Sequence, residues 1–176
     1  EYWRRAFEVV DQTVQATKPK RFFHIGMDED HDRAYSQYTE AIERLRDGLC
    51  ERDLRAVMWN DSACLWPQAY VHHEKALFAE ERISKDIVQL VWDYSGTDSK
   101  ILRRVKRRGF ELWGAPGSNS EKAAMCRDAL LRLGGTGAII TRWIPCRPGQ
   151  RTEILRTVRS CGEVLSAPAE TMPSNG

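Results

Sequence analysis

Residues 21–32 read RFFHIGMDEDHD. The mainly apolar run Phe22–Ile25 has the composition of a buried strand, and positions 28–32 then hold four carboxylates and one histidine. Such a cluster suits the first turn of a helix, where acids meet the positive end of the helix macrodipole. It equally suits a catalytic pair at the mouth of a pocket. The predicted helices and strands on either side help to decide between a helix start and a catalytic pair, because they indicate where residues 21–32 lie in the fold.

Predicted helices and strands alternate along the chain. Apolar residues at helical spacing predict helices over residues 1–17, 32–50, 99–108, 119–133 and 150–164. Short apolar runs predict strands at residues 21–26, 55–59, 86–92, 110–113 and 137–143. These runs lack apolar/polar alternation, which is typical of parallel strands buried on both faces. The sequence therefore predicts an α/β fold, either a (β/α) barrel or a doubly wound sheet. No GxGxxG motif follows a strand, which argues against dinucleotide binding.

The composition argues against two broad classes of protein. The 176 residues suffice for one domain with its own core. A net charge of +2, with arginines dispersed along predicted helices, gives no electrostatic footprint for nucleic acid. No apolar run approaches the roughly 18 residues that a membrane-spanning helix needs. We therefore expect neither nucleic acid nor a membrane as a partner.

The two ends of the chain indicate how much of it is folded, and its cysteines indicate the redox state of its compartment. Residues 1–165 are predicted to form the folded part, and residues 166–176 a disordered tail. The chain opens at Glu1, inside a predicted helix, so we expect the sequence to be a piece of a longer chain. Five dispersed cysteines without a CxxC motif favour reduced thiols and a cytoplasmic location. The compartment stays open, because a signal peptide could precede Glu1.

Four of the five predicted strands end in tryptophan. These residues are Trp59, Trp92, Trp113 and Trp143. In a (β/α) barrel the carboxyl ends of the strands build the active site, so the four indoles would surround one pocket. Flat apolar rings beside carboxylates suit a sugar, whose ring carries C–H groups on its faces and hydroxyls at its edge. The repeated position favours a binding role over simple packing at the barrel mouth.

The two neighbouring carboxylates of Asp28 and Glu29 limit the chemistry they could share. Successive residues of an extended strand point to opposite faces, so both reach one pocket only where the chain turns. In most glycosidases two carboxyl groups face each other across the scissile bond, about 5–5.5 Å apart in retaining enzymes. Adjacent residues approach a substrate from the same side. This geometry suits a protein that supplies an acid but no nucleophile.

The motif around this pair resembles one protein family. Residues 24–29, HIGMDE, are similar to the H-x-G-G-D-E motif of glycoside hydrolase family 20, the β-N-acetylhexosaminidases. The likeness continues in the tryptophan-acid turn WND at residues 59–61, in the strand KDIVQLVW at residues 85–92, and in GAIITRW at residues 137–143. Their order and spacing match strands four to eight of that family's barrel. The resemblance thus covers most of this chain and the C-terminal part of a catalytic domain.

The resemblance implies a (β/α)8 TIM-barrel fold, of which this chain holds about five βα units. It implies removal of β-linked N-acetylhexosamine (GlcNAc or GalNAc) by a substrate-assisted retaining mechanism. Glu29 would act as general acid and base, and Asp28 would orient the substrate's 2-acetamido group. Neither a cofactor nor a metal is implied. The implied substrate contacts are His24, Trp59, Asp61, Trp92, Tyr94, Trp113 and Trp143.

The five predicted strands are too few to close an eight-stranded barrel. A closed eight-stranded barrel typically takes about 250 residues. Five strands leave two sheet edges without a neighbour and an apolar interior open. Besides an N-acetylhexosaminide as substrate, we therefore expect the missing barrel half, or a second chain, to cover these edges.

Three other interpretations stay open from the sequence. A metal site could draw on His24, Asp28, His31 and Asp32, which have the ligand chemistry for a divalent cation. An unrelated α/β interaction domain could use the acidic cluster as a helix start, with its last two aspartates in the first turn.

The third alternative is a carbohydrate-binding relative without catalytic activity, or an inactive fragment. Met27 stands where the family motif has its second glycine. Ile144 follows Trp143 where the family's last strand usually carries a glutamate. The tyrosine expected near the acetamide is absent after Trp113, and Tyr94 is the nearest substitute.

Overall fold

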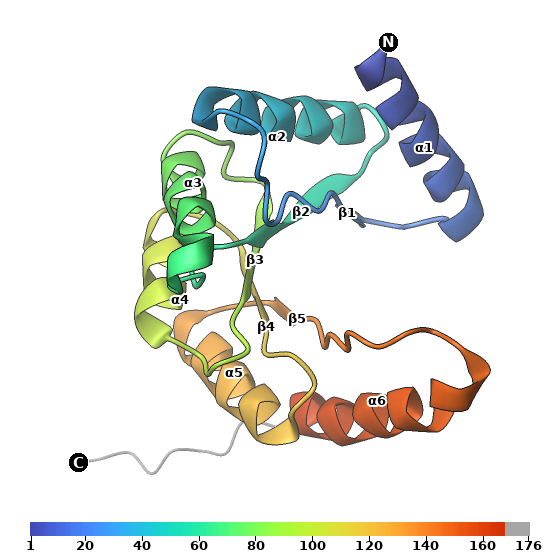
Figure 1. The fold of residues 1–176 in the computed structure, drawn as a ribbon, viewed down its shortest axis with the longest axis vertical. Helices are drawn as coiled ribbons and strands as arrows, with labels where there is room; N and C mark the ends of the chain where they lie inside the picture. Colours follow the sequence, from blue (N-terminus) through green and yellow to red (C-terminus); the bar gives the residue numbers. More distant parts are fainter. Residues whose placement is uncertain (168–176) are drawn as a thin grey trace.

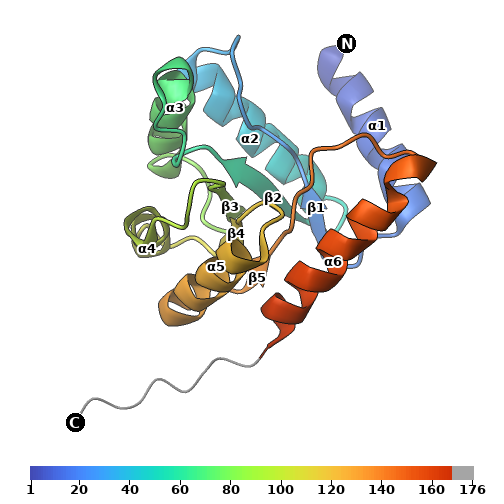
Figure 2. The ribbon, with the colours of Figure 1, turned by 60° about the horizontal axis from the view of Figure 1, so that its bottom comes forward.

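The structure, a computed structural model, describes residues 1–167 (Figure 1). Five parallel strands form one sheet in the order β1-β2-β3-β4-β5. The strands are β1 Phe22–His24, β2 Arg55–Asn60, β3 Val88–Trp92, β4 Leu112–Ala115 and β5 Gly137–Ala138. The helices are α1 Tyr2–Thr17, α2 Tyr35–Cys50, α3 Tyr70–Glu80, α4 Ser99–Arg107, α5 Ser120–Leu133 and α6 Arg151–Ser166, with 3-10 turns at Pro67–Ala69 and Pro148–Gln150. Figures 1 and 2 show the strands curled into an arc with the helices outside. The predicted fold, a partial (β/α) barrel of about five βα units, is confirmed.

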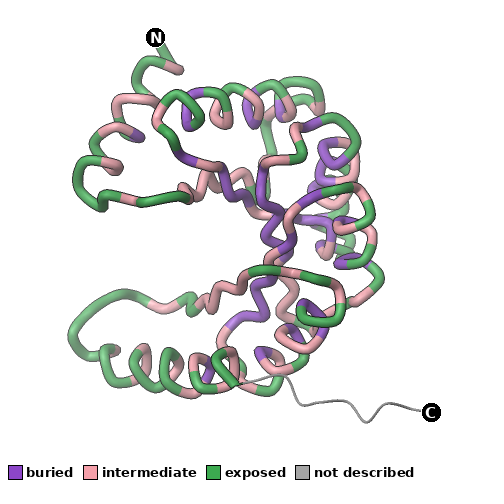
Figure 3. The backbone as a smooth tube through the Cα atoms, turned by 180° about the vertical axis from the view of Figure 1, so that it is seen from behind, coloured by how far each residue is buried: buried purple, intermediate pink, exposed green. Residues whose placement is uncertain are grey.

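The two faces of the sheet build separate apolar clusters, because successive strand residues point to opposite sides. The outer cluster joins strand residues such as Met58 and Leu112 to helix residues such as Ile42. The inner cluster is built by the strands and the segment after β5, with Val57 and Leu90 near its centre. Figure 3 shows the buried residues concentrated in the central strands. Burial on both faces explains why the strand sequences lack apolar/polar alternation.

A buried polar network fixes the carboxyl end of β2 against the helices behind it. The side-chain amide of Asn60 donates to Oε1 of Glu80 at 3.1 Å and to Oε1 of Gln89 at 3.0 Å. Glu80 is 1% exposed and accepts two hydrogen bonds of 3.0 Å from Arg104. Arg108 lies 3.3 Å from the same carboxylate. The network therefore connects β2, β3, α3 and α4 directly beneath the strand ends.

Several helix ends follow local sequence signals. The side chain of Asp98 accepts a hydrogen bond of 2.7 Å from the backbone N–H of Lys100 and caps α4. Asn119 caps α5 in the same way, through the N–H of Lys122 at 2.9 Å. Gly134 ends α5 in the left-handed conformation, with φ 67°, which glycine adopts without steric cost.

Helix α3 was not predicted, because its buried face combines polar and charged residues with two alanines. Residues 70–80 contain His72, Lys75 and Glu80, all of which are buried. An amphipathic pattern read from the sequence assigns such residues to the solvent side, so the helical period is hidden.

The acidic cluster is not a helix start. Helix α2 begins at Tyr35, and its first turn contains no acidic residue. Residues 28–34 form an irregular connection instead, in which Asp30 pairs with Lys75 and Arg33. The interpretation of the cluster as a helix start, with Asp30 and Asp32 in the first turn, is therefore wrong.

The last predicted strand is much shorter than expected. β5 covers only Gly137–Ala138, although residues 137–143 were predicted as a strand. The chain continues beside β4 in irregular form, with Ile139 N–H donating to the Gly114 carbonyl at 3.0 Å. The predicted tail over residues 166–176 lies largely outside the described residues, and α6 ends at Ser166. Within residues 1–167, no helix combines the length and apolar character that crossing a membrane requires.

Candidate active site

A cavity of about 280 Å³ lies at the carboxyl ends of the strands. It is lined by Asp28, Glu29, Trp59, Trp92, Tyr94 and Trp143. These side chains come from the segment after β1, from β2, from β3 and its following loop, and from the segment after β5. The fold thus gathers around one space residues that lie far apart in the sequence, at the edge where α/β barrels bind ligands.

The backbone at the acidic pair turns sharply, which lets both carboxylates face the cavity. Gly26, Met27 and Glu29 adopt left-handed conformations, with φ of 73°, 75° and 49°. Such a conformation is uncommon for a residue other than glycine and costs roughly 1–2 kcal/mol. The hydroxyl of Tyr38, buried in α2, donates to the carbonyl of Met27 at 2.8 Å and holds this turn. The Met27 side chain packs against the outer core and does not line the cavity.

Asp61 lies beneath the cavity and joins two of its walls. Its Oδ2 accepts a hydrogen bond of 2.7 Å from the backbone N–H of Glu29, and its Oδ1 accepts one of 2.8 Å from the indole N–H of Trp92. The residue is 2% exposed. Burial raises the pKa of Asp61 to about 6, the two hydrogen bonds oppose the change, and the charges of Asp28 and Glu29 add to it. Asp61 was predicted to contact substrate, but the structure places it behind the lining residues.

His24 supports the cavity from inside the fold. Its Nδ1 accepts a hydrogen bond of 3.1 Å from the N–H of Gly26, and its ring centroid lies 4.8 Å from that of Trp59. Burial lowers the pKa of His24, and the charge of Asp28 opposes this change. Since Nδ1 accepts a hydrogen bond, the ring is neutral with its proton on Nε2. His24 therefore packs behind the Trp59 wall and does not line the cavity.

Tyr94 connects the loop after β3 to the segment after β5. Its hydroxyl accepts hydrogen bonds of 3.0 Å from the indole N–H of Trp143 and from the hydroxyl of Thr141. Its ring lies 5.2 Å from that of Trp92. Trp143 is 72% exposed, so this tyrosine contact orients an indole that solvent otherwise surrounds. Together the three aromatic side chains form the wall that complements the acidic pair.

Trp113 does not belong to this cavity. β4 continues to Ala115, so Trp113 is its second residue and not its last. Its ring lies 5.0 Å from that of Phe22 and packs over Gly137, where an added Cβ would come within 2.6 Å of the indole. It lines a separate cavity of about 540 Å³ that also contains Phe22 and Glu111. The prediction that it closes its strand beside the other indoles is therefore wrong.

Three residues that support the cavity were not predicted from the sequence. Trp66, in the turn before α3, packs edge-on against Trp92 with ring centroids 5.8 Å apart. Tyr38 and Lys75 hold the segment that carries the acidic pair, and Lys75 donates to the carbonyl of Asp30 at 2.6 Å and to its Oδ1 at 3.0 Å. The high tryptophan content could have pointed to Trp66. Nothing local in the sequence distinguishes Tyr38 or Lys75 from other helix residues.

The residues considered for a metal site do not converge. The ring of His31 packs against His72 at 4.5 Å, on the side of α3, while His24 packs against Trp59. Among residues 1–167, no group of three or more histidine, cysteine, aspartate or glutamate side chains is arranged to hold a metal ion.

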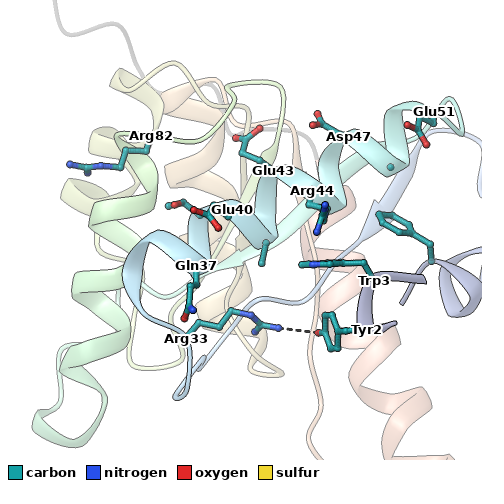
Figure 4. A pocket seen from close by; sticks show the side chains of 14 residues that line it. Tyr2, Trp3, Arg33, Gln37, Glu40, Glu43, Arg44, Asp47, Glu51 and Arg82 are labelled. Atoms are coloured by element: carbon teal, nitrogen blue, oxygen red, sulfur yellow. Dashed lines mark hydrogen bonds between the residues drawn. The ribbon is translucent and has the colours of Figure 1, made fainter. Parts of the chain in front are cut away.

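A larger cavity of about 940 Å³ lies on the outer side of the fold, between α1 and α2 (Figure 4). Arg33 donates to the hydroxyl of Tyr2 at 3.0 Å, and the Arg44 guanidinium lies 5.3 Å from the Trp3 ring. Its lining side chains project mainly from helix surfaces, whereas those of the smaller cavity come from the strand ends. Ligand sites of (β/α) barrels occupy the strand ends, which favours the smaller cavity.

Comparison with known proteins relates the chain to others by fold alone. No family model and no curated protein matches the sequence. The structure is similar to that of a family 20 exo-β-N-acetylglucosaminidase from Vibrio harveyi in complex with N-acetylglucosamine, with a TM-score of 0.57 and 14% identity over 96% of this chain. An inactive aspartate-to-alanine mutant of that enzyme gives a TM-score of 0.52 and 14% identity over 90% of this chain. The chain spans about a third of the length of these enzymes, 32% and 30% respectively.

Proposed function

We propose that this chain carries the acidic and aromatic part of a glycoside hydrolase site that removes β-linked N-acetylhexosamine. The observation that supports this most is the turn at residues 26–29, which directs two adjacent carboxylates into one cavity walled by indoles. Carboxylates beside flat apolar faces match the polar edge and the C–H faces of a sugar ring. The cavity of about 280 Å³ lies near the lower end of the range for small-ligand sites, which suits a single sugar unit.

The position of the carboxylates favours a substrate-assisted mechanism. Asp28 and Glu29 come from one segment, and the other lining side chains in the described part of the chain are aromatic. A retaining enzyme of the usual kind needs a second carboxylate on the far side of the scissile bond. Because adjacent residues approach a substrate from the same side, the substrate's own 2-acetamido group is the nucleophile that fits this pair.

In this mechanism Glu29 donates its proton to the glycosidic oxygen as the bond to the anomeric carbon breaks. The acetamido carbonyl oxygen attacks that carbon and forms a cyclic, positively charged oxazolinium. The Asp28 carboxylate holds the acetamido N–H and stabilises the positive charge. Water then attacks the anomeric carbon and gives its proton to Glu29. The sugar leaves with its original configuration and its acetamido group intact.

The structural neighbour supports the class of ligand proposed here. The Vibrio harveyi enzyme was crystallised with N-acetylglucosamine, and its fold matches this chain over 96% of the residues. At 14% identity this similarity supports the fold alone. The proposed class of sugar therefore depends mainly on the residues that line the cavity.

The proposed activity requires more strands than this chain contains. Within the described residues, β1 and β5 each pair with one neighbour and leave their outer edges open. We propose that the remaining strands of the barrel cover both edges, either from a longer chain or from a second one. A carbohydrate-binding protein without activity is the second candidate, favoured by Ile144 in place of an acid after Trp143.

The test compares two aryl glycosides, the 2-acetamido-β-glucoside and the plain β-glucoside, with the longest available version of the chain. We expect cleavage of the acetamido substrate alone. Glu29→Gln and Asp28→Asn should each reduce kcat/KM by about 100-fold or more. Asp32→Asn is the matched control, because Asp32 is an exposed acid of the same segment and does not line the cavity.

The outcomes separate the two candidates. Equal cleavage of both glycosides would exclude the acetamido group as nucleophile. Binding of the acetamido sugar without cleavage would favour the carbohydrate-binding protein.

A further inference from the structure

We propose that Asp61 is the positioning residue of this site, holding the backbone of Glu29 and the indole of Trp92 in one arrangement. The part of this inference that concerns catalysis rests on the proposed function. Its structural part, the coupling of Glu29 and Trp92 through one carboxylate, is testable without any substrate.

The geometry places Asp61 where three strand ends meet. The residue directly follows β2, and its carboxylate reaches the segment after β1 on one side and the last residue of β3 on the other. Each of its two oxygens accepts one hydrogen bond, at 2.7 Å from the Glu29 N–H and at 2.8 Å from the Trp92 indole N–H. No other pair of hydrogen bonds within residues 1–167 joins the acidic segment to an indole of the cavity.

The contact to Glu29 also stabilises a backbone conformation that would otherwise be unfavourable. Glu29 has φ 49°, in the left-handed region that residues with a Cβ seldom adopt. The charge-assisted hydrogen bond from its N–H offsets part of that cost. Without it, the chain after Met27 would gain freedom to relax toward the extended region, and the Glu29 carboxyl would turn away from the cavity.

The ionised form of Asp61 is the better acceptor for both N–H groups. A protonated carboxyl group carries an O–H donor on one oxygen, which faces one of the two N–H donors unfavourably. The charged and titratable groups around it are Asp28 and Glu29 from the segment after β1, Tyr38 from α2, and Cys64 beyond β2. Burial and the two neighbouring carboxylates raise the pKa of Asp61 to about 6. The coupling of the two site elements is therefore expected to loosen in mildly acidic solution.

The experiment follows two N–H signals by NMR as a function of pH: the backbone amide of Glu29 and the indole of Trp92. In the unmodified full chain both signals should titrate together, with one midpoint near pH 6. In Asp61→Asn the shared midpoint should vanish. Trp92→Phe is the second variant, and it should leave the Glu29 amide titrating, since Asp61 and its bond to Glu29 remain.

Kinetic data then connect this coupling to the proposed reaction. Asp61→Asn should lower kcat about 10- to 100-fold, the change expected from losing one charge-assisted hydrogen bond, and should alter KM less. It should also remove the acidic limb of the pH profile near pH 6, which a purely structural loss of folded protein would not do.

The possible results are distinct. Separate midpoints for the two signals, or a shared midpoint that persists in Asp61→Asn, would overturn the inference. Coupled titration in the longest available version of the chain, with no cleavage of the acetamido glycoside by that version, would sustain the coupling and refute the proposed function. Coupled titration together with an unchanged pH profile in Asp61→Asn would show that Asp61 does not position the reacting groups.

Discussion

Substitution of Lys75 by methionine tests how the acidic segment is held in place. Lys75 lies in α3, and its ammonium group donates to the carbonyl of Asp30 at 2.6 Å and to its Oδ1 at 3.0 Å. The two side chains are 5% and 9% exposed. Methionine keeps much of the length and the apolar stem but removes the charge, which leaves the carboxylate of Asp30 with fewer partners.

The expected cost follows from the burial of this pair. Removing one partner of a buried ion pair destabilises a protein by about 3–5 kcal/mol. Asp30 keeps its contact with Arg33, whose side chain is 34% exposed. We therefore expect the lower end of the range, about 3 kcal/mol, measured by urea unfolding with an unchanged dependence on denaturant.

The effect should depend on pH in a defined direction. Burial raises the pKa of Asp30, but hydrogen bonds from Lys75 and Arg33 outweigh it and hold the pKa below its usual range. A depressed pKa means that the stabilisation is present above the unfolded value of about 3.9 and is lost as the pH falls through the folded value. The destabilisation by Lys75→Met should therefore shrink in acid.

The matched control is Lys100→Met, because Lys100 is an exposed lysine of α4. We expect it to change the free energy of unfolding by no more than about 0.5 kcal/mol. A loss below about 1 kcal/mol for Lys75→Met at neutral pH, or a loss that does not diminish in acid, would refute the reasoning.

Three further predictions concern the same region. Glu80→Ala should destabilise the chain by about 3 kcal/mol in urea unfolding, because it leaves two arginines without their buried partner, whereas the exposed Glu81→Ala should have little effect. Trp59→Ala should raise KM for the acetamido glycoside roughly 10-fold through loss of an aromatic wall, while Trp113→Ala, on the same inner face but outside the cavity, should leave KM unchanged. Because the folded pKa of Asp61 is raised to about 6, the chain should lose roughly 2–3 kcal/mol of stability as the pH rises from 4 to 7, and Asp61→Asn should remove that slope. Equal unfolding curves for Glu80→Ala and Glu81→Ala, equal KM values for Trp59→Ala and Trp113→Ala, or the same pH slope of stability with and without Asp61 would contradict these expectations.

The fold could be predicted because its signals are local and repeated. Apolar strands without alternation, separated by helices, predict a parallel sheet with both faces covered, and the structure has that arrangement. The missed helix α3 shows the limit of this reasoning. Lys75 and Glu80 are charged and yet buried, since their partners Asp30 and Arg104 come from distant segments.

The candidate site was predictable only in part. Asp28 and Glu29 follow a strand, and the fold places both at the cavity that carries Trp59. The sequence does not reveal that Glu29 takes a left-handed conformation, because that depends on the buried Asp61 receiving its N–H. Nor does it reveal that Trp113 lies inside its strand. β4 continues two residues beyond the predicted end, to Ala115, which moves Trp113 to another level on the same face of the sheet.

The central claim is that the substrate's acetamido oxygen, and no protein carboxylate, attacks the anomeric carbon. Its most direct test measures kcat/KM for a series of aryl glycosides whose acetamido group carries zero, one, two or three fluorine atoms. Fluorine withdraws electrons from the carbonyl oxygen and weakens it as a nucleophile. The account predicts a steep fall in kcat/KM with each added fluorine. A flat series, or cleavage of the glycoside that lacks the acetamido group at an equal rate, would contradict it.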